Sequence, residues 1–464
     1  METKSIVVVG GGPAGYTAAI RAAQLGAKVI LIENIELGGA CLNRACIPTK
    51  FLLRSVEIYQ FIKDSARYGI NVPKSYIDFD EIQSRKNSLV STLVSGLTSV
   101  IEMNGIEVIR GHAKLISKRS LEVMDRRGGK YIVDADKIIL ATGSRVKKLD
   151  IPGAYDVGVM FAENILNLND IPESIVIIGG GIVGVEMATI LANLGCHVNI
   201  VEIMPHILPG EDSEITAVLA GALKKDGVRI YTGAVVNRID ANDKGKQVVI
   251  TIQNTKKLIE AETVAIATGY EPYFDKLGLE ESGVAVIGDR VEVNENMETS
   301  VSGIYAAGDV TGGIMLAYVA MAEGRIAAEN ALGGHLKMNY GAVPRCIFTL
   351  PEVACVGLPE DRARLKGYHI ECGRFPFAAN SAANILGERR GMVKIVSDKE
   401  NDRIIGVHII GAGAVDLIPE ATLAVKLGST LDDIKNTLHA HPTLSEVFWE
   451  AILDINGQTI HLKR

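Results

Sequence analysis

Two cysteines five residues apart, Cys41 and Cys46, are the residues of this chain best suited to chemistry. They lie in the segment GGACLNRACIPTK, residues 38–50. On one continuous helix the two positions would be about 7.5 Å apart along the axis, at ~1.5 Å per residue. A disulfide needs Cα atoms closer than ~7 Å, so the spacing predicts a bent or open turn and a bond that is readily reduced. We therefore expect a redox-active disulfide.

Two other readings of the pair remain open at this point. The cysteines could be two buried thiols, or they could be half of a zinc site. A zinc site needs two further ligands in a compact cluster, and no second Cys/His pair follows at the spacing of a zinc finger. The spacing favours the disulfide, and we predict no metal site.

Composition limits the classes of function. The chain has 464 residues, 47% hydrophobic and 22% charged, with a net charge of −7. This size is typical of three or four domains, and the negative charge argues against nucleic acid as the main partner. The first residues lack the pattern of a signal peptide, and the most apolar window, 174–195, contains several glycines and a glutamate, which argues against a membrane span. Six cysteines in so long a chain indicate a reducing compartment, and we expect a cytoplasmic protein.

The elements that must position the cysteines begin with a dinucleotide-binding pattern. It consists of a strand, a glycine turn, a helix and a second strand that ends in an acidic residue: 6–9, then Gly10, Gly12 and Gly15, then 16–25, 28–32 and Glu33. The glycines allow a pyrophosphate to approach the positive end of the helix, and the carboxylate can hold an adenosine ribose. The alternative is a tight turn without a ligand.

The same pattern returns at an offset of 169 residues. The second copy carries four matching positions: Gly179, Gly181, Gly184 and Glu202. The closing strands also match, since Ala141-Thr142-Gly143 is mirrored by Ala267-Thr268-Gly269. An internal repeat of this kind indicates two dinucleotide sites. Because Glu202 would repel a 2′-phosphate, we expect the second site to prefer NAD to NADP.

Helices and strands fill the remainder. Helical spacing predicts two long helices, 51–62 and 80–103, inserted in the first domain, and apolar runs predict short strands at 107–110, 113–116, 121–124, 131–133 and 138–143. Asp309 follows an apolar strand and could accept from a hydroxylated cofactor chain or cap the next helix, which extends to residue 331. The region after 343 has strands at 347–349, 392–396 and 404–409 and helices at 414–427 and 443–454, which predicts an α+β domain with an antiparallel sheet.

A histidine lies close to a carboxylate near the carboxyl end. His441 precedes Glu446 by five residues at the predicted start of the last helix, which we expect at Pro442 or Thr443. A carboxylate that holds one imidazole nitrogen makes the other a better base, as thiol chemistry requires. A helix-capping histidine and a metal pair are the alternatives.

Together these features resemble the flavin-dependent pyridine nucleotide–disulfide oxidoreductases, over essentially the whole chain. The resemblance is carried by Gly10–Gly15 with Glu33, Cys41–Lys50, 141–143, 179–186, Gly308-Asp309, 349–354 and His439–Glu446. It implies an α/β fold with two Rossmann-like domains, a central domain and an α+β interface domain. The implied boundaries are 1–148 for the FAD domain, 149–271 for the NAD domain, 272–341 for the central domain that completes the FAD site, and 342–464 for the dimerisation domain.

The resemblance also assigns roles to individual residues. Cys41 exchanges with substrate, Cys46 contacts the flavin, and Lys50 and Glu186 form an ion pair beside it. His441 and Glu446 act as the acid–base pair and come from the partner subunit of a homodimer. The implied FAD-binding residues are Gly10, Gly12, Gly15, Glu33, Lys50, Ala141, Thr142, Gly143 and Asp309. The implied NAD-binding residues are Gly179, Gly181, Gly184, Glu202 and Gly269.

Some positions differ from the common family pattern. Ala40 and Ala45 stand where Thr and Gly are usual, and Arg44 adds a charge between the cysteines. Tyr270 replaces an arginine and Tyr318 a histidine. None of these changes removes a predicted catalytic group.

The function implied by the resemblance is oxidation of protein-bound dihydrolipoamide to lipoamide, with NAD as acceptor. Its partner would be a lipoyl-bearing carrier protein or acyltransferase of a 2-oxoacid dehydrogenase or glycine cleavage type complex, with no nucleic acid and no membrane involved. One alternative is another NAD(P)H-dependent disulfide or metal reductase of the same family. From a different class, the alternative is a non-catalytic FAD-bound structural subunit, which would need none of the four residues Cys41, Cys46, His441 and Glu446.

Overall fold

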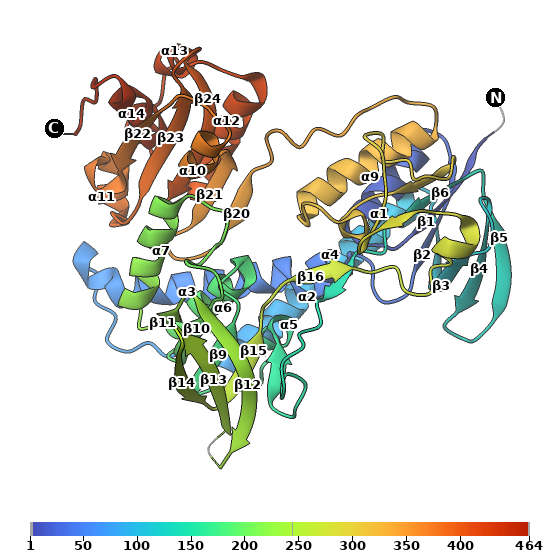
Figure 1. Cartoon of the computed structure of the whole chain (residues 1–464), viewed down its shortest axis with the longest axis horizontal. Coiled ribbons are helices and arrows are strands. Elements are labelled where there is room, and N and C mark those ends of the chain that lie inside the picture. The colour runs from blue at the N-terminus through green and yellow to red at the C-terminus, as the bar shows by residue number, and fades with distance from the viewer. Residues whose placement is uncertain (1–2, 244, 463–464) are drawn as a thin grey trace. The chain divides into compact units, whose positions relative to one another are not determined.

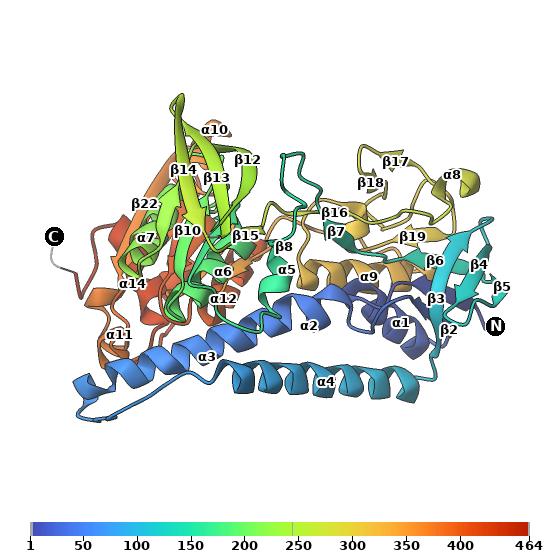
Figure 2. The same cartoon turned by 90° about the horizontal axis from the view of Figure 1, so that it is seen from below.

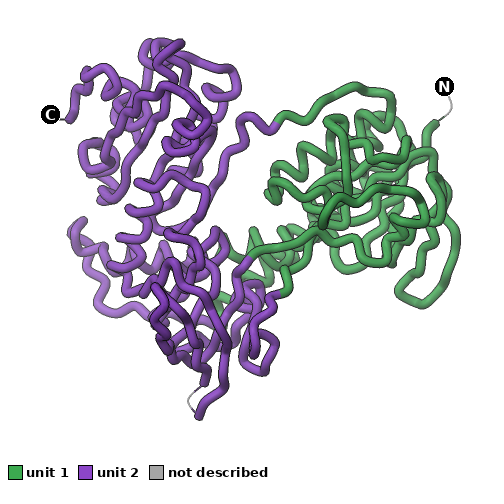
Figure 3. The backbone as a smooth tube through the Cα atoms, in the orientation of Figure 1, with its two compact units in different colours: residues 1–51, 80–148, 269–339 green, residues 52–79, 149–268, 340–464 purple. Residues whose placement is uncertain are grey.

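The computed structural model describes residues 3–243 and 245–462. The chain divides into two compact units, shown in green and purple in Figure 3. Unit 1 comprises residues 1–51, 80–148 and 269–339, and unit 2 comprises residues 52–79, 149–268 and 340–464. Each unit is therefore built from segments that are distant in the sequence.

Unit 1 contains a seven-stranded sheet in the order β19-β6-β1-β2-β3-β4-β5 (Figure 1). Its strands are β1 (Ser5–Val9), β2 (Lys28–Glu33), β3 (Glu107–Leu115), β4 (Ser120–Asp125), β5 (Lys130–Asp134), β6 (Lys137–Leu140) and β19 (Ile304–Ala306). The pairs among β19, β6, β1, β2 and β3 are parallel, whereas β3, β4 and β5 form an antiparallel meander. The uninterrupted apolar run of β1 is buried on both faces, as expected for a central parallel strand.

Helices accompany this sheet in unit 1. In unit 1 they are α1 (Pro13–Gln24), α2 (Gly39–Arg44), α4 (Phe79–Met103), α8 (Leu279–Ser282), α9 (Ala317–Ala331) and the 3₁₀ turn η2 (Asp309–Thr311). Helix α3 (Cys46–Asp64) begins in unit 1 and runs on into unit 2, where η1 (Ser65–Tyr68) follows it. Figure 2 shows α3 and α4 as the two long helices that the sequence predicts. Two short strand pairs, β7 (Ser144–Val146) with β16 (Tyr270–Pro272) and β17 (Val286–Ile287) with β18 (Arg290–Val291), complete the unit.

Helices α1 and α9 pack closely because small residues line their contact. A Cβ atom at Gly324 of α9 would lie 2.2 Å from the carbonyl oxygen of Ala14 in α1, so only glycine fits there. Ala18 and Ala327 are fully buried in the same core. This contact fixes α1, and with it the glycine turn that precedes α1.

The first part of unit 2 repeats the pattern of unit 1. Its parallel sheet has the order β11-β10-β9-β15-β8, with β8 (Val159–Phe161), β9 (Ser174–Ile178), β10 (His197–Val201), β11 (Arg229–Tyr231) and β15 (Thr263–Ile266). A three-stranded antiparallel sheet follows, made of β12 (Ala234–Asn242), β13 (Gly245–Ile252) and β14 (Thr255–Ala261). The helices are α5 (Ala162–Ile165), α6 (Ile182–Asn193) and α7 (Ser213–Lys225).

The last part of unit 2 is the predicted antiparallel sheet with helices. The strand order is β20-β21-β24-β23-β22, with β20 (Arg345–Ile347), β21 (Val353–Gly357), β22 (Ile370–Pro376), β23 (Met392–Asp398) and β24 (Arg403–Ile410). Its helices are α10 (Glu360–Leu365), η3 (Phe377–Ala379), α11 (Ser381–Leu386), α12 (Ala414–Leu427), α13 (Leu431–Lys435) and α14 (Glu446–Ile455).

Three details of the sequence prediction were wrong. Residues 107–110 and 113–116, expected as separate strands, form the single strand β3, because Gly111 continues the strand and approaches Met124 too closely for a Cβ atom. Strands β21 and β22 were not predicted, and neither was the sheet of β12, β13 and β14. The last helix begins at Glu446 and not at Pro442 or Thr443, since residues 443–445 form a turn whose Thr443 N–H bonds the Glu446 carboxylate.

A row of polar side chains crosses the entire antiparallel sheet β20-β21-β24-β23-β22. Residues directly opposite one another on neighbouring strands point to the same face. The registers align one residue from each strand, and we call this set the charged row: Arg345, Cys355, His408, Lys394 and Arg374.

Carboxylates from two other segments of unit 2 face the charged row. Lys394 is only 1% exposed, and its Nζ lies 2.9 Å from Asp212, 2.7 Å from Glu214 and 2.8 Å from Glu360. Hydrogen bonds from Arg374 and then from Lys394 lower the pKa of Glu214 to about 2. This network holds the start of α7 against the sheet.

We predict that Lys394→Met lowers the free energy of unfolding by about 3–5 kcal/mol, because it leaves three carboxylates without their buried cation. Urea unfolding followed by circular dichroism measures the change. Lys399→Met is the matched control, since its pair with Glu371 is half exposed and should contribute about 1 kcal/mol or less.

The loss of unfolding free energy in Lys394→Met should depend on pH. A carboxyl group with a lowered pKa stabilises the fold above its ordinary pKa, and this contribution is lost as the pH falls toward about 2. Equal unfolding midpoints for the two lysine variants at neutral pH would contradict the assignment.

Candidate active site

The glycine turns of the two repeats, residues 10–15 and 179–184, use their glycines for two different purposes. At Gly10, φ is +103° and a Cβ atom would lie 2.2 Å from the Ala141 carbonyl oxygen, and at Gly15 it would lie 1.7 Å from that of Gly10. These two glycines let protein segments approach one another. Gly12 is different, because a Cβ atom there would meet nothing closer than Gly39 Cα at 3.8 Å. The middle glycine therefore faces open space at the start of α1.

The second turn has the same division of roles. A Cβ atom at Gly179 would lie 2.4 Å from the carbonyl oxygen of Ala267, and one at Gly184 would lie 2.0 Å from that of Gly179, whereas one at Gly181 would meet nothing within 4 Å. In both repeats the middle glycine is the N-cap of the helix, and no side chain caps the first N–H groups. The two helix N-termini are thus open to an anion.

The acidic residues of the two repeats are held in matching ways. Glu33 accepts from the N–H of Gly11 at 2.6 Å and of Ile35 at 2.5 Å. Glu202 accepts from the N–H of Gly180 at 2.6 Å and of Met204 at 2.8 Å. Each carboxylate is therefore fixed beside its glycine turn, and each oxygen keeps a lone pair that can accept from a ribose hydroxyl. The residues present fit a dinucleotide in both repeats.

Two further residues of unit 1, Asp309 and Gly143, are predicted to belong to the first nucleotide site. Asp309 lies in η2 and accepts from Ser144 Oγ at 2.6 Å, and burial raises the pKa of its carboxyl group. It does not cap the following helix, because α9 begins at Ala317. After β6 the chain turns at Gly143 with a φ of +78°, and a Cβ atom there would meet nothing within 4 Å. Gly269, the matching glycine after β15, is similarly open.

The remaining two residues of the closing segment are held by the protein itself. Ala141 donates its N–H to Val9 O at 2.7 Å, and Thr142 Oγ1 donates to Tyr273 O at 2.5 Å. Both bonds fix the backbone at the end of β6. The predicted role of this segment in FAD binding stays a prediction.

The helix is interrupted between the two cysteines. Cys41 lies in α2 and Cys46 is the first residue of α3, and the intervening Ala45 has φ −136° and ψ −91°, outside the helical region. The bent turn that the spacing predicts is therefore present. A side-chain hydrogen bond with Cys46 is the main cause that raises the pKa of Cys41, followed by burial, so the two sulfur atoms lie within hydrogen-bond reach.

Other charged and polar groups of unit 1 act on the thiol pair. The Lys50 ammonium opposes the rise in the pKa of Cys41, whereas the Asp309 carboxylate adds to it. Tyr16 was not predicted as a site residue, but burial and then the charges of Cys41 and Cys46 raise its pKa. Its position one turn after Gly12 in α1 is the signal that could have placed it near the site.

Glu186 is a buried residue of α6, 4% exposed, and its Oε1 accepts from the N–H of Phe348 at 2.9 Å. Lys50 belongs to unit 1 and Glu186 to unit 2. Their predicted ion pair therefore stays a prediction.

The predicted acid–base pair is formed within unit 2. His441 Nδ1 lies 2.9 Å from Glu446 Oε1, and the other oxygen of Glu446 accepts from the N–H of Thr443 at 2.9 Å. The His441 side chain is 63% exposed, whereas that of Glu446 is 13% exposed. Burial raises the pKa of Glu446, but the bonds from Thr443 and His441 outweigh it and the pKa is lowered. His441 does not cap α14, whose N-cap is Ser445.

A neighbouring histidine has a different environment. His439 Nε2 lies 3.1 Å from Glu420 Oε1, and the histidine side chain is 6% exposed. The hydrogen bond with Glu420 raises the pKa of His439 despite burial. Of the two histidines, His441 is the one whose ring reaches the surface of the chain.

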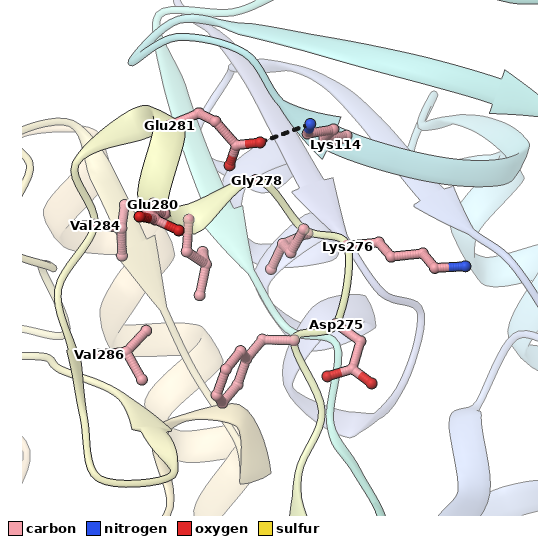
Figure 4. Close-up of a pocket in the computed structure, with 11 residues that line it drawn as sticks. Lys114, Asp275, Lys276, Gly278, Glu280, Glu281, Val284 and Val286 are labelled. Atoms are coloured by element: carbon pink, nitrogen blue, oxygen red, sulfur yellow. Dashed lines mark ion pairs between the residues drawn. The ribbon is translucent and has the colours of Figure 1, made fainter.

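A surface pocket of unit 1 lies away from these residues (Figure 4). It has a volume of about 780 Å³ and is lined mainly by residues 274–286, with the Lys114–Glu281 ion pair at 2.7 Å on its rim. None of the predicted site residues lines it. Its position gives no reason to connect it with the thiol chemistry.

Known proteins match this chain over nearly its whole length. Residues 4–324 match the family described as pyridine nucleotide-disulphide oxidoreductase, and residues 343–452 match the dimerisation domain of that family.

The chain belongs to the pyridine nucleotide–disulphide oxidoreductases.

The family assignment confirms the resemblance, the fold class and the two cofactors drawn from the sequence, FAD and NAD. A dihydrolipoyl dehydrogenase of Bacillus subtilis is 39% identical over 98% of this chain and 100% of its own length. One from Thermus scotoductus is 38% identical over 100% of this chain and 99% of its own. The dimerisation domain supports a homodimer. In the part of the chain that the structure describes, no helix is both long and apolar enough to span a membrane.

Solved structures agree with this assignment. LpdA from Mycobacterium tuberculosis superposes with a TM-score of 0.89 at 28% identity, covering 97% of this chain and 99% of its own. A Cu(II) complex of the HOCl-induced flavoprotein disulfide reductase RclA from Escherichia coli superposes with a TM-score of 0.86 at 30% identity, covering 98% of this chain and 99% of its own. The similar proteins therefore carry two different names for their activity, dihydrolipoyl dehydrogenase and flavoprotein disulfide reductase.

The geometry of Glu202 predicts coenzyme choice. The protein should use NAD far better than NADP. Glu202→Ala should weaken the binding of NAD by about 1.5–3 kcal/mol, because the ribose loses its hydrogen bond to a charged acceptor. Steady-state kinetics with both coenzymes test this. Glu260→Ala, on β14 of the same unit, is the control and should leave KM for NAD unchanged. Equal rates of the native protein with NAD and NADP would contradict the prediction.

Proposed function

We propose that this protein oxidises protein-bound dihydrolipoamide to lipoamide with NAD as acceptor. The observation that carries the proposal is the His441–Glu446 pair, in which the carboxylate holds Nδ1 at 2.9 Å and the ring remains largely exposed. This pairing fixes the tautomer with the proton on Nδ1, so Nε2 can accept a proton from a substrate thiol. Relatives named dihydrolipoyl dehydrogenase over the full chain support the same substrate.

The thiol chemistry follows from the cysteine pair. His441 takes a proton from one thiol of dihydrolipoamide, and the resulting thiolate attacks Cys41 of the Cys41–Cys46 disulfide. A mixed disulfide forms and Cys46 leaves as a thiolate. The second substrate thiol then displaces Cys41, which releases lipoamide and leaves both cysteines reduced. The substrate loses two electrons and two protons, and the cysteine pair gains the electrons.

The residues around the pair assist these steps. Lys50 lies one helical turn after Cys46 on α3, where its positive charge favours the thiolate form of the thiol pair. The two nucleotide sites hold FAD through Gly12 and Glu33 and NAD through Gly181 and Glu202. When bound, FAD supplies the hydride chemistry that links the dithiol to NAD.

The assembly is also part of the proposal. We place His441 and Glu446 at the disulfide of the partner subunit in a homodimer, since the dimerisation domain carries both residues. The lipoyl group would arrive on a carrier protein or acyltransferase of a 2-oxoacid dehydrogenase or glycine cleavage type complex. We expect this to take place in the cytoplasm, as the cysteine content suggests.

A disulfide or metal reductase is the second candidate function. It is favoured by the likeness to RclA, whose structure is described as a Cu(II) complex. Reduction of a metal ion needs the cysteine pair but has no need for a histidine held to accept a thiol proton. The His441–Glu446 pair therefore favours a thiol or disulfide substrate over a metal ion, and the relatives named dihydrolipoyl dehydrogenase favour dihydrolipoamide.

The cysteine roles predict a spectroscopic result. Anaerobic addition of two electrons should give a long-wavelength absorption band from the Cys46 thiolate beside the flavin. Cys46→Ser should abolish the band, whereas Cys41→Ser should keep it. Persistence of the band in Cys46→Ser would exclude Cys46 as the thiol that faces the flavin.

The role of His441 predicts a split between two activities. His441→Gln should slow oxidation of dihydrolipoamide by roughly 10²–10⁴-fold, the usual contribution of a positioned acid–base group. Oxidation of NADH by an artificial acceptor requires no transfer of a thiol proton and should be nearly unchanged. His439→Gln is the control, because His439 is buried against Glu420.

Mixed dimers test which subunit supplies the histidine. A dimer of one Cys41→Ser and one His441→Gln subunit would contain one complete site and should regain activity. If subunits exchange and no activity returns, His441 does not serve the disulfide of the partner subunit.

A further inference from the structure

Three buried side chains outside the proposed active site bring metal-binding atoms together. One donor atom from each of Glu211, Cys355 and His408 lies within 4.8 Å of the other two. Among the residues that the structure describes, no other trio of His, Cys, Asp or Glu meets this condition. All three side chains belong to unit 2, and the redox cysteines are not among them.

The sheet register places two of the three ligands side by side. Cys355 on β21 lies directly opposite His408 on β24, so both side chains point to the same face. Glu211 reaches this face from the turn before α7, where the next residue, Asp212, caps the helix. The cluster is therefore built on rigid elements that the charged row already holds together.

His408 has a ring nitrogen without a partner. Its Nε2 lies 3.1 Å from Leu358 O, which can only accept, so Nε2 carries the proton. The lone pair is then on Nδ1, which is buried and has no hydrogen-bond partner among the described residues, and His408 as a whole is 0% exposed. A buried polar atom without a partner is uncommon, and a bound ion or water molecule is one explanation for it.

The surrounding charges can tolerate a cation. Arg345 binds both oxygens of Glu211, at 2.5 and 2.9 Å, and each oxygen keeps a second lone pair. Four carboxylates face the charged row, from Glu211, Asp212, Glu214 and Glu360. They pair with three buried or half-buried cations of the row, Arg345, Arg374 and Lys394, so the carboxylates outnumber these cations by one. Arg364 also reaches Glu360, but its side chain is 60% exposed.

We propose that Cys355 Sγ, His408 Nδ1 and a carboxylate oxygen of Glu211 form a binding site for Zn²⁺, although no metal site was predicted from the sequence. Sulfur, imidazole nitrogen and carboxylate oxygen are the three ligand types of zinc, and a water molecule would supply the fourth position. On binding, the Cys355 thiol releases its proton to solvent and the Zn–S bond forms, with no oxidation or reduction. The metal would join β21, β24 and the start of α7.

The experiment must separate this site from the redox thiols, which can also bind zinc when reduced. The background is therefore the full-length, FAD-loaded protein with Cys41→Ser and Cys46→Ser. Because the cluster is buried, Zn²⁺ or Co²⁺ is supplied while the chain is expressed and folds. Metal content is measured by plasma mass spectrometry after gel filtration. We expect one equivalent of metal and, with Co²⁺, a near-ultraviolet thiolate-to-metal absorption band.

Variants within the cluster then decide the ligands. Cys355→Ser should abolish the cobalt band and reduce the bound metal by about tenfold or more. Mutation of residues that only hold a metal ligand in place already lowers metal affinity ~10–100-fold, and Cys355 is itself a proposed ligand. Cys372→Ser is the matched control. Cys372 lies on β22, with β24 and β23 between it and the strand of Cys355, and it is not part of the trio, so the variant should keep both signals. His408→Asn removes the ring nitrogen and should act like Cys355→Ser.

Flavin content and circular dichroism show which variants have folded, and either ligand variant alone is sufficient for the test. The proposal is overturned if the background protein holds no metal. It is also overturned if a folded Cys355→Ser or His408→Asn variant keeps the full equivalent.

Discussion

The interruption of the helix at Ala45 is the constraint on which the chemistry depends. A continuous helix would hold the two cysteines about 7.5 Å apart along its axis, too far for a disulfide. Because Ala45 leaves the helical region, Cys41 can lie within hydrogen-bond reach of Cys46 while both stay attached to helices. The proposed disulfide could therefore form and break without unfolding either helix. Lys50, one turn into α3, is positioned by the same helix.

The two nucleotide sites depend on a second local device that occurs twice. In each, a carboxylate at the end of a strand accepts an N–H from the glycine turn, at 2.6 Å in both copies. The carboxylate thus fixes the turn as well as offering an acceptor to a ribose. This explains why the glutamates Glu33 and Glu202 are almost completely buried although a ligand is expected to reach them.

Much of this could be read from the sequence, because the signals were local. The glycine spacing, the repeat at an offset of 169 residues and the cysteine pair each lie within short segments, and the structure places the corresponding elements as predicted. The charged row could not be predicted in this way. It depends on the register of five strands and on a turn near residue 211, and no local pattern links these positions. The start of α14 was wrong for a similar reason, since one hydrogen bond from Thr443 to Glu446 decides it.

The central claim is that the Cys41–Cys46 pair, together with the exposed, carboxylate-held His441, is proposed to oxidise dihydrolipoamide. The most direct test compares kcat/KM of the purified, FAD-loaded protein for three reactions: dihydrolipoamide with NAD, glutathione disulfide with NADPH, and Cu(II) with NADH. The account predicts that the first reaction is the fastest by a wide margin. Faster reduction of Cu(II) or of glutathione disulfide than oxidation of dihydrolipoamide would contradict it.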